Sequence, residues 1–175
     1  MIREKLIKRF GEALERLAES GAEELRKQGH RATGRLVNSL EGKVTSADLD
    51  KLVGVILAED YGLIVDSGVK PGRVPYSGPG GGGTSKYIQG LLDWVSVIRP
   101  GLADQEKKSF VFAIANKHRR EGIPTRGSYS FSANGRRKEW IKFGLADPAE
   151  DLEKHLRLTA LLLQSYEESI TEAAA

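Results

Sequence analysis

The stretch that decides the fold reads Ala32-Thr33-Gly34-Arg35-Leu36-Val37-Asn38-Ser39-Leu40, and Tyr61-Gly62-Leu63-Ile64-Val65-Asp66-Ser67-Gly68 follows it downstream. Neither stretch carries residues in a catalytic pattern. The first predicts a short helical element that opens at Thr33 and turns its leucines and valine to one side. The second predicts a third strand or a short helix, because periodicity cannot distinguish the two over so few residues.

The residues around these stretches predict helices and a small sheet. Apolar residues recur at helical spacing from Ile2 to about Gln28 and predict a long amphipathic helix, which Gly29 ends. Strand character follows at residues 42–45 and 52–58, and residues 47–50 predict the hairpin connection between them. We therefore expect an antiparallel strand pair packed on the first helix.

The second half of the chain predicts further helices. Residues 68–84 are rich in glycine and proline and predict a loop. Two helices are expected next, one capped by Thr84 or Ser85 with Ile88, Leu91, Leu92, Val95 and Ile98 inward, and one over 103–120 with Phe110, Ile114 and Ala115 inward. A β-hairpin with Asn134-Gly135 at its turn is plausible within 123–144. A final helix is expected from Pro148 towards Ile170.

These elements define an α+β fold, in which a small antiparallel β-sheet is packed with a long N-terminal helix and two to three further helices. Residues 1–145 form the expected domain, with a flexible loop at 68–84, and residues 146–175 form a helix that belongs to it or acts as an assembly arm. The chain has 175 residues, a net charge of +3 and no cysteine, so it offers neither a disulfide framework nor a thiolate metal site. A charged N-terminus without a signal peptide favours a cytosolic origin, and no apolar run is long enough to span a membrane.

The glycine-rich loop matches a nucleotide-binding pattern by letter only. Gly78, Gly80 and Gly83 fit G-x-G-x-x-G. A phosphate-binding loop needs a buried strand leading into it, and the prolines before this loop argue against one. We expect a surface loop that orders against neighbouring chains, and name these glycines as its assembly residues.

No catalytic or metal-binding constellation is found in the sequence. His30, His118 and His155 lie far apart, and no H-x-x-x-H pattern or G-x-S-x-G elbow occurs. The sequence therefore predicts a protein that is not an enzyme and that needs no cofactor.

Charge is divided between two adjacent segments. Residues 117–142 hold eight lysines and arginines against two glutamates, a net charge of +6, and Tyr129, Phe131 and Trp140 lie among them. After Ala146 seven acids face two basic residues, a net charge of −5. Three interpretations stay open: solvated surface, complementary faces on neighbouring subunits, or contact with nucleic acid. The candidates for the basic face are Arg119, Arg120, Arg126, Arg136, Arg137 and Lys138, and for the acidic face Glu150, Asp151 and Glu153.

The order of the motifs resembles a family of bacteriophage neck and tail-completion proteins. The resemblance covers roughly residues 1–125. It rests on an N-terminal helix, a strand pair and the following stretches: Thr33-Gly34-Arg35-Leu36-Val37-Asn38-Ser39, Tyr61 to Gly68, Arg73-Val74-Pro75, Leu91-Leu92-Asp93-Trp94-Val95, Phe112-Ala113-Ile114-Ala115-Asn116-Lys117 and Gly122-Ile123-Pro124.

The resemblance implies a structural virion protein made in the cytoplasm of a host bacterium. Such a protein forms a homo-oligomeric ring at the head–tail junction, joins head to tail and lines the passage for DNA. Its implied partners are other neck, portal-adaptor and tail-tube proteins and the genomic DNA, with no membrane. The alternative function is that of a nucleic-acid-binding accessory protein that uses the basic segment 117–142.

Overall fold

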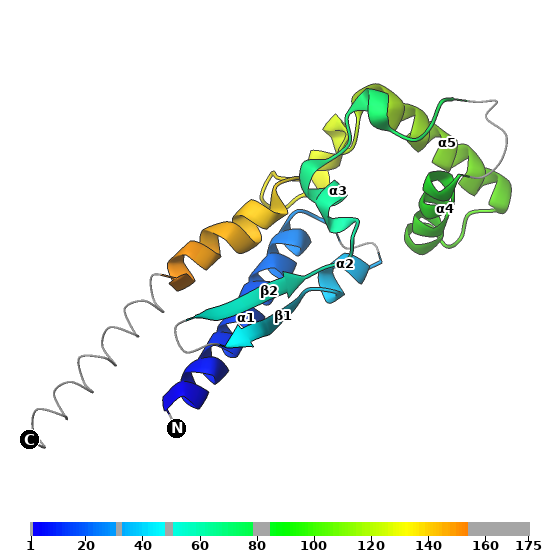
Figure 1. Cartoon of the computed structure of the whole chain (residues 1–175). Coiled ribbons are helices and arrows are strands. Elements are labelled where there is room, and N and C mark those ends of the chain that lie inside the picture. Colours follow the sequence, from blue (N-terminus) through cyan, green and yellow to red (C-terminus); the bar gives the residue numbers. More distant parts are fainter. Residues whose placement is uncertain (1, 31–32, 48–50, 79–84, 154–175) are drawn as a thin grey trace, which may run out of the picture.

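The computed structural model describes residues 2–30, 33–47, 51–78 and 85–153, and its fold is α+β, as predicted. A long helix, a two-stranded sheet and a helical hairpin dominate it (Figure 1). The elements in chain order are α1 (Ile2–Lys27), α2 (Arg35–Asn38), β1 (Glu41–Ala47), β2 (Leu52–Leu57), α3 (Gly62–Ser67), η1 (Pro71–Arg73), α4 (Lys86–Ile98), α5 (Asp104–Glu121), η2 (Arg126–Phe131) and η3 (Lys142–Ala146).

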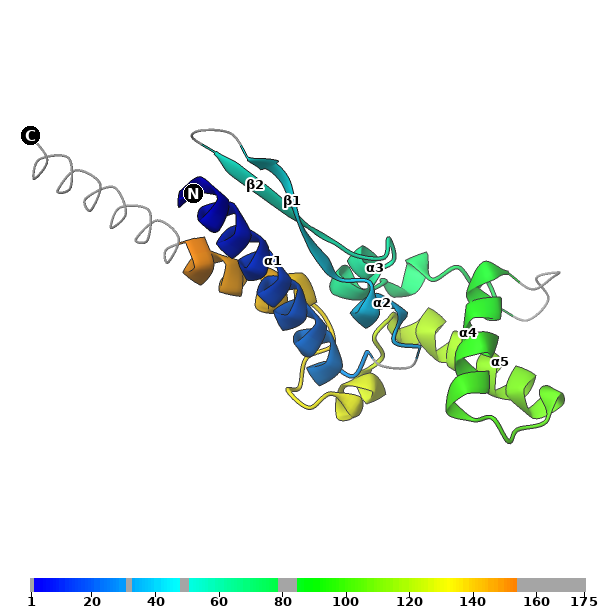
Figure 2. The same cartoon turned by 90° about the horizontal axis from the view of Figure 1, so that it is seen from below.

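Helix α1 lies at the centre of the main body, between the sheet and the C-terminal helix (Figure 2). The strands β1 and β2 pair antiparallel, with Gly42 opposite Ile56 and Val44 opposite Gly54. A Cβ atom at Gly42 would come within 2.4 Å of the Leu14 carbonyl carbon, and one at Gly54 within 2.3 Å of the Leu14 side chain. The two glycines therefore allow the hairpin to lie directly on the helix.

The C-terminal helix begins at residue 140, so the predicted start near Pro148 is wrong. Its described part covers residues 140–153 and contains the π-helical turn η3, in which the Asp147 N–H bonds to the Lys142 carbonyl. Proline inside a helix crowds the carbonyl one turn earlier. The wide turn directly before Pro148 lets the helix continue past it. Gly144 in this turn faces Gly21 of α1 at close range.

Two separate clusters of buried side chains hold the fold together. In the body, the indole of Trp140 is buried against Leu25, Leu36 and Val37 and donates a hydrogen bond to the Gly62 carbonyl at 2.9 Å. The second cluster joins the two helices of the α4–α5 hairpin through Ile88, Val95, Val111 and Ala115. We call this hairpin the arm, because it stands away from the body in both views (Figures 1 and 2).

The structure tests three local predictions, which concern residues 62–67, the hairpin within 123–144 and the inward face of α5. Residues 62–67 form a short helix, one of the two alternatives for that stretch. Residues 126–131 form the 3-10 turn η2, so the plausible hairpin around Asn134-Gly135 is not formed. Phe110 is exposed and Val111 takes the buried position in α5, because three consecutive apolar residues cannot all face one side of a helix.

The first part of the expected loop is held against α5. Val69 pairs with Ile123 through two backbone hydrogen bonds of 2.7 and 2.8 Å, η1 packs on α5, and Val74 is buried. Residues 68–78 form a mostly exposed loop, as predicted, that is anchored at these points, and residues 79–84 lie outside the described residues.

Candidate functional site

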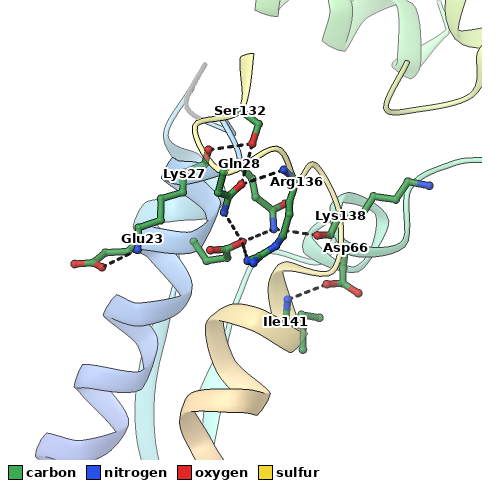
Figure 3. Close-up of polar contacts among 10 residues, drawn as sticks. Glu23, Lys27, Gln28, Asp66, Ser132, Arg136, Lys138 and Ile141 are labelled. Carbon is green, nitrogen blue, oxygen red and sulfur yellow. Dashed lines mark hydrogen bonds and ion pairs between the residues drawn. The ribbon is translucent and has the colours of Figure 1, made fainter. Parts of the chain in front are cut away.

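A buried polar cluster surrounds the C-terminal end of α1 (Figure 3). The Glu24 carboxylate oxygen Oε1 accepts hydrogen bonds from Gln28 at 2.9 Å and from the Asn134 side chain at 2.9 Å, and lies 3.3 Å from the Arg136 guanidinium. Gln28 is fully buried and also donates to the Lys138 carbonyl at 3.0 Å. The cluster joins the helix to a segment more than a hundred residues later in the chain.

The same segment satisfies the free carbonyls at the end of α1. A helix leaves its last four carbonyls without intrahelical partners. The Lys27 carbonyl accepts hydrogen bonds from the Ala133 N–H at 2.7 Å and the Ser132 hydroxyl at 3.3 Å. The Gln28 carbonyl accepts one from the Arg137 guanidinium at 2.5 Å. Positive charge near a helix C-terminus is also favourable, so Arg136 and Arg137 stabilise the fold itself.

Burial and nearby charge alter the titration of two groups beside this cluster. Burial lowers the pKa of the Arg137 guanidinium. Burial, and then the Arg137 charge, lower the pKa of His30 to about 4, so this imidazole is neutral at pH 7. The half-buried Arg137 therefore lies beside a histidine that carries no charge at pH 7.

The predicted basic face is divided by the structure. Arg136 and Arg137 were expected at an interface, but their guanidinium groups bind α1 of the same chain. The Arg136 guanidinium also lies 3.9 Å from the ring centroid of Phe143, a cation–π contact. Lys138 is half-buried and contributes its carbonyl to Gln28. The charged groups of Arg136 and Arg137 are therefore used within the fold, and Lys138 takes part in it through its backbone carbonyl.

The remaining basic candidates lie on the surface near the end of α5. Arg119 and Arg120 are exposed on its last turn, and Arg126 is exposed at the start of η2. The Arg126 N–H donates to the Glu121 carboxylate at 3.1 Å, but its guanidinium has no ion pair within the described ranges. Arg119 also approaches Gly78, whose φ is +116°, while Gly80 and Gly83 lie outside the described residues.

The acidic candidates lie at the other end of the body. Glu150, Asp151 and Glu153 are exposed on the last described turns of the C-terminal helix. At 1.5 Å per residue they lie about 15–20 Å along the axis from the start of this helix at residue 140. Arg136, Arg137 and Lys138 directly precede that start, so these acidic and basic candidates are placed at opposite ends of the described part of the helix.

The arm exposes several large apolar side chains whose exposure the sequence did not predict. Val97, Ile98 and Phe112 are exposed to 55%, 39% and 44%, and Phe110 to 39% beside a shallow hollow at the arm's tip. Phe112 stacks obliquely on Tyr76, with ring centroids 6.3 Å apart. A signal was available in the sequence, because Phe110, Val111 and Phe112 are consecutive.

Tyr87 and His118 make a polar contact inside the arm, and no metal-binding group is found among the described residues. The Tyr87 hydroxyl lies 2.7 Å from His118 Nδ1 between α4 and α5, and burial lowers the pKa of His118. Among the described residues no group of three or more histidine, aspartate or glutamate side chains is placed to hold a metal ion. None of the helices in the described part of the chain has the length and apolar character needed to cross a bilayer.

Comparison with known proteins gives no relative. No family model matches the chain, and neither a curated protein nor a solved structure matches it.

Proposed function

We propose that the chain is a structural virion protein of a tailed bacteriophage, which forms a ring at the head–tail junction and lines the passage for DNA. The proposal starts from the order of the motifs named above. Each of them falls within a helix or at the end of one, and three glycines in them have positive φ. Gly34 precedes α2 with φ +69°, Gly68 ends α3 with φ +71°, and Gly122 ends α5 with φ +83°. The motifs therefore specify backbone shape, as expected of a protein that works by assembly.

The observation that carries the proposal is the arm. It has its own small core, stands away from the body, and exposes Val97, Ile98, Phe110 and Phe112. Large apolar side chains exposed on a projecting element favour protein–protein contact. A ring needs a projecting surface on one subunit that meets a different surface on the next one, which is a head-to-tail contact.

Native mass spectrometry and electron microscopy of the purified chain test the proposal. We expect a closed oligomer that Val97→Asp weakens, since a charge would enter the apolar surface of the arm. Ser96→Asp adds the same charge at the neighbouring exposed position of α4 and serves as the matched control. A monomer at all concentrations, or a ring equally sensitive to both substitutions, would refute the role given to the arm.

Nucleic-acid binding by the basic segment is the second candidate, and the exposed cluster of Arg119, Arg120 and Arg126 supports it. Phosphate contacts make affinity fall steeply as salt rises. If a monomer binds DNA with a steep salt dependence that Arg119→Gln and Arg120→Gln reduce, this second function replaces the first.

A further inference from the structure

We propose that the outer edge of β2 pairs, antiparallel and around a two-fold axis, with β2 of a second copy of the chain. This contact goes beyond the proposed ring. A two-fold contact joins the same surface on both copies and closes at two, whereas a ring of identically oriented subunits uses head-to-tail contacts.

The two strands of the hairpin differ in how their edges are protected. Proteins protect exposed strand edges with charges, prolines or irregular register. Strand β1 has two of these features: Glu41 and Lys43, whose charged atoms lie 3.6 Å apart, and a register shift between Val44 and Ser46. Strand β2 contains only leucine, valine, isoleucine and glycine, and no other described strand pairs with it besides β1. Its outer edge is therefore open to another strand.

Helix α1 lies more under β1 than under β2. It meets β2 at Gly54, through the side chain of Leu14. On the opposite face Val55 and Leu57 are exposed to 37% and 44%. An arriving strand thus finds unprotected backbone groups together with apolar side chains two residues apart.

The sequence of β2 is compatible with pairing to itself. With the axis at Val55, each Val55 lies opposite its own copy, Gly54 lies opposite Ile56, and Val53 lies opposite Leu57. Each side-chain pair is aliphatic or matches a large residue with glycine, and like charges do not meet. Five residues of each strand take part in this register, which is most of β2.

The two α1 helices have room beside each other in this arrangement. Neighbouring strands lie about 4.8 Å apart, so the two β1 strands at the outside of a four-stranded sheet lie about 14 Å apart. Packed helices need 8–10 Å between their axes. Each α1 lies more under its own β1 than under β2, and the two helices therefore do not collide.

Cysteine cross-linking in the full-length chain tests the contact, because the chain has no cysteine of its own. Directly opposed residues of antiparallel strands have Cβ atoms roughly 4.5–5.5 Å apart, close to disulfide reach. We expect Val55→Cys to form a covalent dimer on mild oxidation. Lys43→Cys lies opposite Val55 within the hairpin but on β1, and as the matched control it should not cross-link.

A charge at the axis gives the second test. Val55→Lys places two ammonium groups opposite each other and should raise the dimer dissociation constant, measured by sedimentation, by at least about tenfold. Circular dichroism of the variant should match that of the original chain, since Val55 is exposed. A monomeric original chain, equal cross-linking of the two cysteine variants, or an unchanged dissociation constant overturns the proposal. Rings that form without a Val55 cross-link would overturn this contact and leave the proposed function standing.

Discussion

Replacing Gly144 with alanine tests the closest contact between α1 and the C-terminal helix. An added Cβ would lie 2.9 Å from the Gly21 Cα and 3.0 Å from the Glu24 Cβ. The first of these atoms belongs to the backbone of α1, so it cannot move without shifting the helix. The second belongs to the residue that anchors the polar cluster. The substitution therefore strains both the packing of the helices and the cluster.

The expected magnitude follows from two opposing effects. Overpacking a tight contact costs about 1–3 kcal/mol. Alanine in place of glycine inside a helix contributes about 0.5–1 kcal/mol of stability. The free energy of unfolding should thus fall by about 0–2.5 kcal/mol in Gly144→Ala, with a central value near 1 kcal/mol. Gly11→Ala is the matched control in α1, because its Cβ would meet Val44 at an ordinary distance of 3.8 Å. The control should be more stable than the original chain by about 0.5–1 kcal/mol.

Urea unfolding followed by tryptophan fluorescence measures both changes. The chain has two tryptophans, Trp94 in the arm and Trp140 in the body. A Trp94→Phe background makes the signal report the body alone, where both glycines lie. One kcal/mol corresponds to roughly 2–4 °C in Tm for a chain of this size, so thermal unfolding gives an independent reading. If Gly144→Ala is as stable as Gly11→Ala or more so, the close helix contact is refuted.

Three further predictions concern the body. The pKa of His30 is about 4 in the folded chain and 6.5 in the unfolded chain. Between these values the unfolded state binds more protons. The contribution of His30 to the free energy of unfolding is therefore full above pH 6.5 and is lost as the pH falls towards 4. We expect a loss of about 1–2 kcal/mol after allowing for partial solvent screening, and urea titrations of His30→Gln should show a flatter pH profile, while an identical profile would contradict the assignment. Glu24→Gln should lower the free energy of unfolding by about 1–3 kcal/mol, because it leaves the partly buried guanidinium of Arg136 without its carboxylate. Glu23→Gln is the control at an exposed ion pair and should change the free energy of unfolding by less than about 0.5 kcal/mol. Equal effects of the two substitutions would count against the cluster. Gly42→Val should separate the hairpin from α1 and lose strand signal in circular dichroism, and a spectrum and Tm equal to those of the original chain would show that the sheet does not depend on this approach.

The parts of the fold that sequence predicts well are those governed by local periodicity. The stripe of α1 spans many turns, and the strand pair is bounded by turn residues, so both were predicted with nearly their observed limits. The final helix was misplaced because Pro148 is well suited to a first helical position. A π-helical turn accommodates it inside the helix instead, and such a turn depends on the packing of Gly144 on α1.

The polar cluster could not be predicted because its members are distant in sequence. Nothing local distinguishes Arg136, which pairs with Glu24, from Arg120 on the surface of α5. The difference arises because the segment 132–137 lies over the end of α1. There Ser132 and Arg137 donate to free carbonyls and Arg136 reaches Glu24. A net charge calculated along the sequence therefore overstates the charge that this segment presents to a partner.

The junction between body and arm explains why two of the motif glycines stand where they do. A Cβ at Gly68 would lie 2.4 Å from the Ile123 carbonyl oxygen, and one at Gly122 would lie 2.5 Å from the Val69 carbonyl oxygen. The positive-φ turns at Gly68 and Gly122 thus lie side by side and are joined by the Val69–Ile123 backbone pair. This pair lies where the chain enters and leaves the arm. Backbone hydrogen bonds between rigid turns fix the direction of a projecting element better than flexible side chains do. If the arm makes the contact between subunits, this junction sets the angle between neighbours, and with it the number of copies at which a ring closes.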